Sequence, residues 1–258
     1  MAVDKREVSK GRLQYHLKVR PGDVARYVLL PGDPGRVRRI AEHMDEAEEV
    51  AQNREFLTVT GTYKGVRVSA TSTGIGCPSA SIAVEELANV GAEVFIRVGT
   101  SAALQPHVRI ADLIIPNGAV RNEGTSYFYV PEGFPAVPSL GVLLALRRAA
   151  ESLGYRHHVG IISSDDAFYA ETPEYLEGLR ELGVISLDME SSAIFIVSHL
   201  RGLEAGTVNG VVANLSTGEG GLVDQDDPRR AEAIDRAIKT ALEAVVILEG
   251  EREGKRGG

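Results

Sequence analysis

The chain has 258 residues and a formal net charge of −8, with 43% hydrophobic and 25% charged residues, as expected of a globular protein with a sizeable core. The negative balance argues against a general nucleic-acid-binding surface, so any anion site must be a local cluster of basic side chains. Cys77 is the one cysteine of the sequence, which excludes an intramolecular disulfide, and no Cys/His spacing suggests a metal site. The N-terminus lacks an apolar export segment, and no run approaches the roughly 20 apolar residues of a membrane span, so we expect a cytoplasmic protein.

The first strand–turn–helix unit follows a short segment that carries His16. Residues 26–30 are predicted to form a strand, and a turn containing Gly32 leads through Arg36 into a helix near Val37. The free N–H groups and the positive dipole end of a helix start attract anions. Arg36 opposes that dipole, so it either needs an anionic neighbour or is a solvated surface arginine.

The next segment contains two predicted strands, at 53–60 with a turn at Gly61 and at 66–70. The sequence Thr73-Gly74-Ile75-Gly76 then provides a flexible loop before a helix that is predicted from the apolar spacing to run to about residue 90. This repeats the strand, glycine turn and helix start of the first unit and indicates a second anion-attracting loop.

Arg97 interrupts the apolar strand predicted at 94–98, just before Gly99 and Thr100. A buried arginine is costly unless it has an acidic partner or a ligand. Because ligands gather at the carboxyl ends of strands in α/β sheets, this position favours a phosphate site. The apolar strand sequence alone does not exclude the alternative, in which Arg97 forms an internal ion pair with a carboxylate such as Glu85 or Glu86.

The second half of the chain continues to alternate strands and helices, which predicts an α/β sandwich around a largely parallel sheet. We expect one domain over residues 1–258 with its core at about 13–249, because nothing marks a linker. Strands are predicted at 112–116 with an irregular continuation to 122, at 159–163, 185–189 and 208–214; helices at 140–152, 173–183, 191–200 and 228–248; a loop at 215–221; and a disordered tail at 250–258.

Two features of this half are candidates for ligand contacts. The adjacent aromatics Phe168 and Tyr169 follow a strand and either stack on a flat ligand or cap the core. Glu190 follows a strand and opens a helix, so it either caps that helix or accepts two hydrogen bonds from a vicinal diol. Ser79 replaces the third glycine of a dinucleotide fingerprint, and neither a P-loop nor a G-x-S-x-G motif occurs, which disfavours dehydrogenases, P-loop NTPases and serine hydrolases.

Five motifs in order resemble the hexameric nucleoside phosphorylases, the family of uridine phosphorylase and the bacterial-type purine nucleoside phosphorylases. The resemblance extends from about His16 to Leu248 and implies a three-layer α/β domain around a mixed, partly barrel-like sheet, assembled as a trimer of dimers. The motifs are Gly32-Asp33-Pro34-Gly35-Arg36, Arg54-Glu55-Phe56, Ser72-Thr73-Gly74-Ile75-Gly76, Phe95-Ile96-Arg97-Val98-Gly99-Thr100 and Asp188-Met189-Glu190-Ser191.

The resemblance also implies roles for individual residues. Arg97, Arg36 and Glu190 would carry the catalysis. Phosphate would be bound by Gly32, Arg36, Arg97 and Thr100, with Arg54 from the neighbouring subunit; the ribose by Glu190, Met189 and the neighbour's copy of His16; and the base by Phe168 and Asn214. No cofactor and no metal is expected, because inorganic phosphate is the co-substrate, and neither nucleic acid nor a membrane is an expected partner.

The implied reaction is reversible phosphorolysis, in which phosphate attacks C1′ of a nucleoside to give ribose 1-phosphate and free base. Uridine is slightly favoured, although the stretch Ala170-Glu171-Thr172-Pro173-Glu174 lacks the glutamine and arginine that read uracil in uridine phosphorylases. Asn214 replaces the aspartate of the purine enzymes, yet an amide can still hydrogen-bond a 6-oxopurine, so inosine and guanosine are the alternative substrates. A nucleosidase that uses water leaves the arginines without a role, and a nucleoside-binding module is the non-enzymatic alternative.

Overall fold

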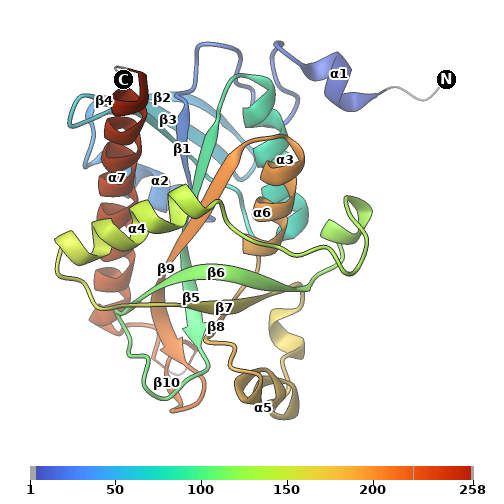
Figure 1. Cartoon of the computed structure of the whole chain (residues 1–258), viewed down its shortest axis with the longest axis vertical. Helices are drawn as coiled ribbons and strands as arrows, with labels where there is room; N and C mark the ends of the chain where they lie inside the picture. Colours follow the sequence, from blue (N-terminus) through green and yellow to red (C-terminus); the bar gives the residue numbers. More distant parts are fainter. Residues whose placement is uncertain (1–3, 223, 257–258) are drawn as a thin grey trace.

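The computed structural model describes residues 4–222 and 224–256, which form an α/β fold around one ten-stranded sheet (Figure 1). The strands are β1 (Tyr27–Leu30), β2 (Asp45–Asn53), β3 (Phe56–Tyr63), β4 (Val66–Thr71), β5 (Val94–Ala103), β6 (Leu113–Asn122), β7 (His157–Asp165), β8 (Ser186–Asp188), β9 (Glu204–Asn214) and β10 (Glu219–Gly220). The helices are α1 (Lys5–Ser9), α2 (Pro34–Ala41), α3 (Cys77–Asn89), α4 (Leu140–Ser152), α5 (Pro173–Glu181), α6 (Ser191–Leu200) and α7 (Pro228–Arg256), with short 3-10 turns η1 (Ser126–Phe128) and η2 (Phe168–Ala170).

The sheet is mixed and closes partly on itself. Its strand order is β10-β9-β6-β7-β8-β5-β1-β4-β3-β2, and an additional pairing of β9 with β5 closes five of the strands into a barrel. The strand β1 lies parallel to both β4 and β5, whereas β5 and β8 run antiparallel. The predicted α/β class with a mixed, partly barrel-like sheet is therefore confirmed.

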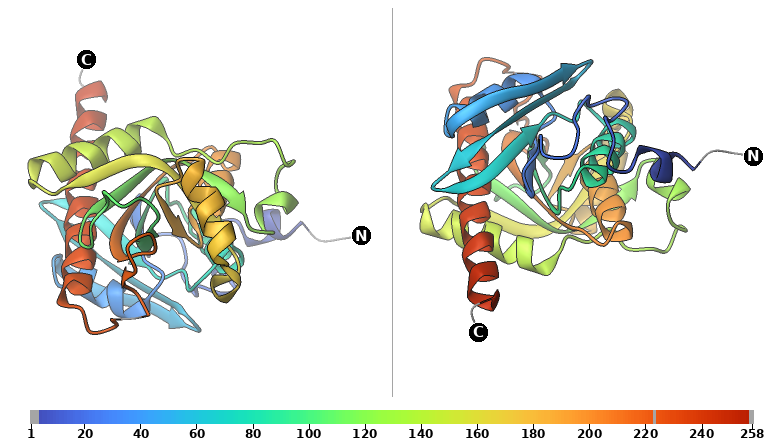
Figure 2. Two further views of the ribbon diagram at one scale, coloured as in Figure 1. Left: turned by 90° about the horizontal axis from the view of Figure 1, so that it is seen from below. Right: turned by 90° about the horizontal axis from the view of Figure 1, so that it is seen from above.

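Helices cover the sheet on both faces, so the molecule has three layers (Figures 1 and 2). One apolar core lies between the sheet and α2, α4 and α7, with buried residues such as Ile40, Leu146 and Leu242. A second core lies under α3 and α6 and includes Leu87 and Ile194. Burial of these apolar helix faces supplies the main stabilisation of such a fold. Among the described residues, no helix is both long and apolar enough to span a bilayer.

Two glycines of β9 allow the helices of the first core to approach the sheet closely. A Cβ atom on Gly206 would lie 2.5 Å from Val142 of α4, and one on Gly210 would lie 2.4 Å from the backbone oxygen of Ala233 on α7. Because backbone cannot rotate away as a side chain can, the second contact is the more restrictive.

Gly210→Ala is therefore expected to lower the free energy of unfolding by about 3 kcal/mol, the upper part of the range for overpacked sites. Urea denaturation measures the loss. Gly178→Ala on α5 is the matched control, because nothing lies within 4 Å of its added Cβ, and a helical Gly→Ala change adds about 0.5–1 kcal/mol. Equal stability of the two variants would contradict this packing.

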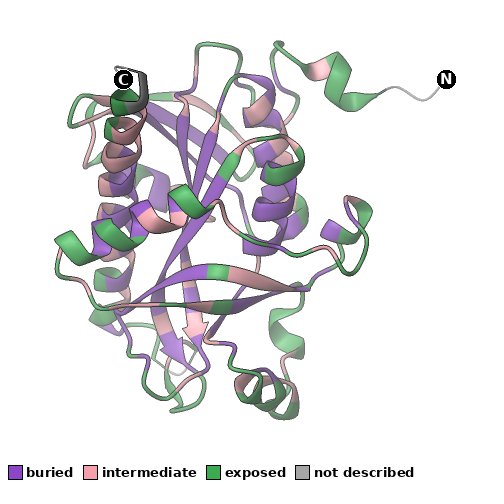
Figure 3. Cartoon of the chain, viewed as in Figure 1, coloured by how far each residue is buried: buried purple, intermediate pink, exposed green. Residues whose placement is uncertain are grey.

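The strand β2 was not predicted from the sequence, and one predicted turn is wrong. The strand β2 has the sequence DEAEEVAQN, mostly exposed, and pairs antiparallel with β3 at the sheet edge (Figure 3). Its acidic residues have low strand propensity, but backbone pairing with β3 decides its structure. The predicted turn at Gly61 is wrong, because Gly61 lies inside β3, where a Cβ would meet backbone atoms of Asp45 and Ala47 at 3.0 Å.

The predicted disorder of residues 250–258 is also wrong over 250–256, which extend α7. Side chains of this extension pair with the rest of the chain: Arg252 Nη1 lies 3.0 Å from Glu93 Oε2, and Arg148 pairs with Glu251. Helix propagation adds one hydrogen bond per residue once a helix exists, so a charged tail can continue it. Gly257 and Gly258 lie outside the described residues. The predicted loop at 215–221 contains β10, which pairs with β9.

Candidate active site

The two glycine turns found in the sequence lie side by side at the carboxyl ends of neighbouring parallel strands. The Thr73 N–H donates to Pro31 O (2.8 Å) and the Gly74 N–H donates to Gly32 O (3.0 Å). A Cβ on Gly32 would lie 3.1 Å from Gly74 O, so a side chain there would push the turns apart. The other neighbour of β1 is β5, and Leu30 at the end of β1 pairs with Arg97. The strand expected to end at Val98 continues to Ala103, so the ends of β4 and β1 lie beside the middle of β5.

Arg36 is a buried cation that forms no ion pair with any acidic residue described by the structure. Asp33 caps α2 by accepting from the Gly35 N–H (2.8 Å), which places Arg36 in the first turn. The Arg36 side chain reaches β5, where Nη1 donates to Val98 O (3.0 Å). The residue is only 9% exposed, its Nε has no hydrogen-bond partner, and no carboxylate of the described residues forms an ion pair with it. Burying an unpaired cation is costly, so this arrangement favours the binding of an anionic ligand.

Burial lowers the pKa of Arg36 to about 10, and the nearby charge of Arg97 adds to that effect. Arg36 therefore stays charged at neutral pH, although two guanidinium groups repel each other here. An anion bound between Arg36 and Arg97 would reduce the repulsion between the two guanidinium groups, so this repulsion favours anion binding.

Arg97 is fully enclosed and is held by two carboxylates. Its Nε lies 3.1 Å from Asp188 Oδ2, and its Nη2 pairs with Glu190. The internal ion pair left open by the sequence therefore exists, but with different partners. Glu85 pairs with Arg6 and Arg201, and Glu86 binds His16.

Glu190 does not cap α6, so the capping interpretation is wrong. Asp188 takes that role, because its carboxylate accepts from the N–H groups of Glu190 and Ser191 (both 3.3 Å). The Glu190 carboxylate instead accepts from the Gly76 N–H at 2.8 Å. The anion that the glycine loop attracts in this structure is thus the carboxylate of Glu190.

Burial raises the pKa of the Glu190 carboxyl and the charge of Asp188 adds to the rise, whereas Arg97 opposes it. Thr100, further along β5 from Arg97, and Met189, next to Glu190, are both half-buried. The structure thus brings together six of the predicted site residues: Gly32, Arg36, Arg97, Thr100, Met189 and Glu190.

His16 and Arg54 gather at a different place, the turn between β2 and β3. His16 Nδ1 lies 2.6 Å from Glu86 Oε1, and Asn53 Nδ2 donates to His16 O (2.7 Å). Because a carboxylate only accepts, Nδ1 carries the proton and Nε2 is left for another partner. Arg54 is exposed with φ of 54°, and within residues 4–222 and 224–256 its side chain forms no hydrogen bond or ion pair.

Two carboxylates hold predicted site residues in ways that the sequence did not indicate: Asp188 holds Arg97, and Glu86, considered only as a partner of Arg97, holds His16. Glu86 is 8% exposed on the buried face of α3 beside Leu87. A charge among apolar helix positions needs a partner, and that pattern was the available signal. Asp188 was visible as a carboxylate within the strand predicted at 185–189, and it is the last residue of β8.

Asn214 cannot read a base in the way the sequence suggests. Its Nδ2 donates to Gln105 O (3.0 Å) and Val108 O (2.7 Å), and its Oδ1 accepts from the N–H groups of Ser216 (2.9 Å) and Thr217 (3.2 Å). Both ends of the amide are used inside the protein, so Asn214 fixes the loop after β9 instead.

Phe168 is 46% exposed in η2 and packs edge-to-face against Tyr169, with 5.1 Å between ring centroids. A polar cluster lies beside this turn, in which Asp165 accepts from Ser163 Oγ (2.5 Å) and from Tyr175 OH (2.8 Å). The half-buried Glu171 follows η2, and burial, with a smaller effect from Asp165, raises its pKa from 4.5 to about 6.

The raised pKa of Glu171 makes the stability of the protein depend on pH. The folded carboxyl binds its proton more tightly than the unfolded one, so its stabilising contribution is complete below pH 4.5 and is lost as the pH rises through about 6. Glu171→Gln is expected to gain stability over the wild type across this window, reaching about 1 kcal/mol at pH 7 once solvent screening is allowed for. Urea denaturation at pH 4, 5, 6 and 7 measures the difference, with the exposed Glu174→Gln as control. A difference that does not vary with pH would contradict the burial of Glu171.

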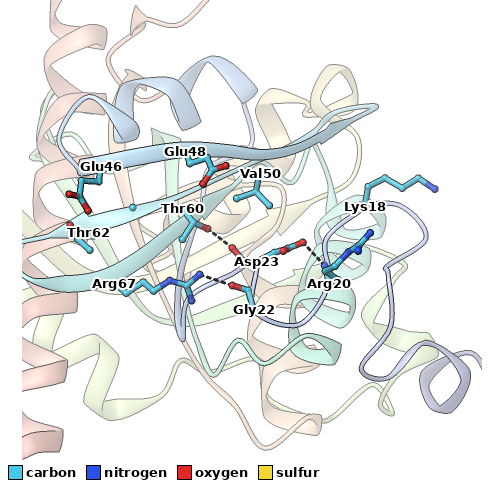
Figure 4. Close-up of a pocket in the computed structure, with 11 residues that line it drawn as sticks. Lys18, Arg20, Gly22, Asp23, Glu46, Glu48, Val50, Thr60, Thr62 and Arg67 are labelled. Carbon is cyan, nitrogen blue, oxygen red and sulfur yellow. Dashed lines mark hydrogen bonds between the residues drawn. The ribbon is translucent and has the colours of Figure 1, made fainter.

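A separate cleft of about 640 Å³ lies between the loop after Lys18 and strands β2 and β3 (Figure 4). The cleft is lined by basic residues such as Arg20 and by acidic residues such as Glu46 and Glu48. The guanidinium of Arg67 donates hydrogen bonds to Gly22 O and Val24 O. None of the predicted site residues lines this cleft. Within the described part of the chain, no group of three or more His, Cys, Asp or Glu is placed to hold a metal ion.

The chain is similar to known proteins along nearly its whole length. A family model described as the phosphorylase superfamily matches residues 26–246. A uridine phosphorylase of Thermococcus kodakarensis is 48% identical, over 95% of this chain and 91% of that protein. A guanosine phosphorylase of Halorubrum lacusprofundi is 44% identical, over 91% of this chain and 99% of that protein. The crystal structure of a uridine phosphorylase from Vibrio fischeri superposes with a TM-score of 0.85 at 38% identity, covering 90% of this chain and 97% of that one. The resemblance drawn from the five motifs is confirmed, and the chain belongs to the phosphorylase superfamily.

Proposed function

We propose that this protein is a nucleoside phosphorylase that cleaves uridine with inorganic phosphate in the cytoplasm. The observation that carries the proposal is Arg36, a buried guanidinium that lacks a carboxylate partner in the described chain and lies close to a second guanidinium, Arg97. A divalent oxyanion fits this pair, because arginine binds phosphate with charge-assisted and often bidentate hydrogen bonds.

Phosphate would bind between Arg36 and Arg97, with Gly32 and Thr100 beside it. Nη2 of Arg97 forms an ion pair with Glu190, so phosphate would replace the Glu190 carboxylate on this nitrogen. Glu190 would then be free to accept hydrogen bonds from the two secondary hydroxyls of the ribose, above Met189. The two substrates would therefore bind cooperatively, since each uses a group that the other releases.

The reaction would exchange one bond at C1′ for another. A phosphate oxygen forms a bond to C1′ while the bond from C1′ to the base nitrogen breaks, and the base leaves with the electron pair and takes up a proton. The sugar is oxocarbenium-like between these events, and a phosphate fixed beside C1′ stabilises its charge. Positioning would supply much of the rate enhancement, and no cofactor enters the scheme.

His16 and Arg54 would complete the site of a neighbouring subunit in a homo-hexamer built as a trimer of dimers. Support comes from their placement together at the β2–β3 turn, where His16 offers Nε2 and Arg54 is exposed without an ion pair among the residues described. His16 would contact the 5′-hydroxyl, and Arg54 would reach the phosphate of the other subunit.

The base would stack near Phe168. Uridine is our first choice because the 48% identical relative is a uridine phosphorylase, and guanosine is the second because the 44% identical relative is a guanosine phosphorylase. The internal hydrogen bonds of Asn214 remove the residue that had favoured a 6-oxopurine.

The test is to incubate the protein with uridine, guanosine, inosine and adenosine, with and without phosphate, and to follow base release by chromatography. We expect release only with phosphate and fastest from uridine. Release that does not depend on phosphate would make the protein a hydrolase, and binding without release would make it a nucleoside-binding module. Faster release from guanosine would reverse the assignment of the base.

A further inference from the structure

Asn209 is a buried polar residue in the middle of the apolar strand β9. Its neighbour Gly210 faces outward, because a Cβ there would meet α7. Successive residues of a strand face opposite sides, so Asn209 faces inward, as does Thr207, whose hydroxyl lies 3.0 Å from that of Ser191. Asn209 is 0% exposed.

Gly99 is the residue that lets Asn209 approach Arg97. Gly99 and Asn209 are paired across β5 and β9. A Cβ on Gly99 would lie 2.1 Å from Asn209 Oδ1 and 3.0 Å from Arg97 Nε. The amide and the guanidinium thus share the space above one glycine, and any side chain at position 99 would expel one of them.

Both groups have buried polar atoms without a partner. Asp188 and Glu190 hold Nε and Nη2 of Arg97. Among the residues that the structure describes, Nη1 has no hydrogen-bond partner, and neither Oδ1 nor Nδ2 of Asn209 has one. An unsatisfied buried polar group costs about 1–3 kcal/mol. The three atoms belong to two side chains that meet above Gly99, where a small rearrangement would gain hydrogen bonds.

We propose that Asn209 positions Arg97 for phosphate, with Asn209 Oδ1 accepting from Nη1 when phosphate replaces Glu190 on Nη2. This inference rests on the proposed function of Arg97. A neutral acceptor suits the task, because it orients the guanidinium without cancelling its charge, whereas a third carboxylate would compete with the anion. Asp188 holds one side of Arg97, Asn209 holds another, and the remaining nitrogen faces phosphate.

The test measures binding of inorganic phosphate by isothermal titration calorimetry, together with KM for phosphate, KM for uridine and Tm. Asn209→Leu is close in size and removes the acceptor, and Asn209→Asp adds the charge. Thr240→Val on α7 is the control, because Thr240 Oγ1 is another buried atom that has no hydrogen-bond partner within the described part of the chain. We expect Asn209→Leu to weaken phosphate binding about tenfold, the size of one lost hydrogen bond to a charged group. Asn209→Asp should weaken phosphate binding further. For Asn209→Leu, we expect KM for uridine and Tm to stay close to the values of Thr240→Val.

Phosphate binding by Asn209→Leu that equals the wild type would overturn the positioning role. A rise of both KM values with a lowered Tm would also overturn it, because it would reduce Asn209 to a packing residue. A wild-type protein that binds no phosphate would instead overturn the proposed function and, with it, this inference. If Asn209→Asp fails to fold, Asn209→Leu still decides the question.

Discussion

Arg97→Ala is expected to lower kcat/KM for phosphorolysis by about 10²- to 10³-fold, the loss found when one donor to a developing or attacking anion is removed. Arg97 is one of two guanidinium groups beside the ends of β1 and β4 and is enclosed at 4% exposure. Steady-state kinetics with uridine and phosphate as variable substrates measures the effect. We expect kcat/KM for phosphate to fall more than kcat/KM for uridine.

The interpretation of Arg97→Ala needs a second variant, because the change also leaves Asp188 and Glu190 without their cation. Removing one partner of a buried ion pair costs about 3–5 kcal/mol of stability. Arg36→Met has no such effect, since Arg36 pairs with no carboxylate of the described chain, and it removes a buried cation. We expect Arg36→Met to lose phosphate binding with an unchanged or higher Tm. Full activity in either folded variant would remove that arginine from the mechanism.

Glu190→Gln is expected to reduce turnover of uridine by about a hundredfold or more while the fold is kept. Two hydrogen bonds from ribose hydroxyls to a carboxylate are each worth about 1.5–3 kcal/mol, and an amide oxygen accepts them less strongly. The fold should survive because Asp188 caps α6 and Glu190 does not. Kinetics and thermal unfolding of the purified variant measure the two parts of this expectation.

The substrate supplies the control for Glu190. With 2′,3′-dideoxyuridine the wild type loses the same hydrogen bonds, so the difference between wild type and Glu190→Gln should shrink. Binding of phosphate alone should be retained or tightened in the variant, because Arg97 is released from one of its two carboxylates. A Glu190→Gln protein that unfolds, or one with equal losses on both substrates, would contradict the ribose-binding role.

Local patterns predicted most helices and strands of this protein correctly. The helices at 140–152 and 191–200 agree with α4 and α6 residue for residue, because apolar spacing is a local property of the chain. The strand β2 was missed because its acidic sequence has no such pattern and depends on pairing with β3. The closure of five strands through β5 and β9 depends likewise on register between distant segments.

The candidate site was predicted in outline and not in its contacts. The glycine turns and predicted strand ends placed Gly32, Arg36 and Arg97 near one another, and the structure agrees. The predicted end of the strand after Arg97 is wrong, because pairing with β9 continues β5 to Ala103. The partners of Arg97 were not predictable, since Glu85, Glu86, Asp188 and Glu190 were all available carboxylates. Asn214 was misread because its hydrogen bonds to residues 105 and 108 arise only when β9 meets the loop after β5.

The sequence by itself determined most of the helices and strands, where the glycine turns lie and which arginines lie beside those turns. These features follow from residue type and spacing, which act over a few residues. The tertiary structure alone decided that Arg97 is balanced by Asp188 and Glu190, that Arg36 is left without an acidic partner in the described chain, and that Asn209 lies beside Arg97 above Gly99. Such relations depend on strand register and on burial, which bring together groups a hundred residues apart and set the cost of leaving each of them unpaired.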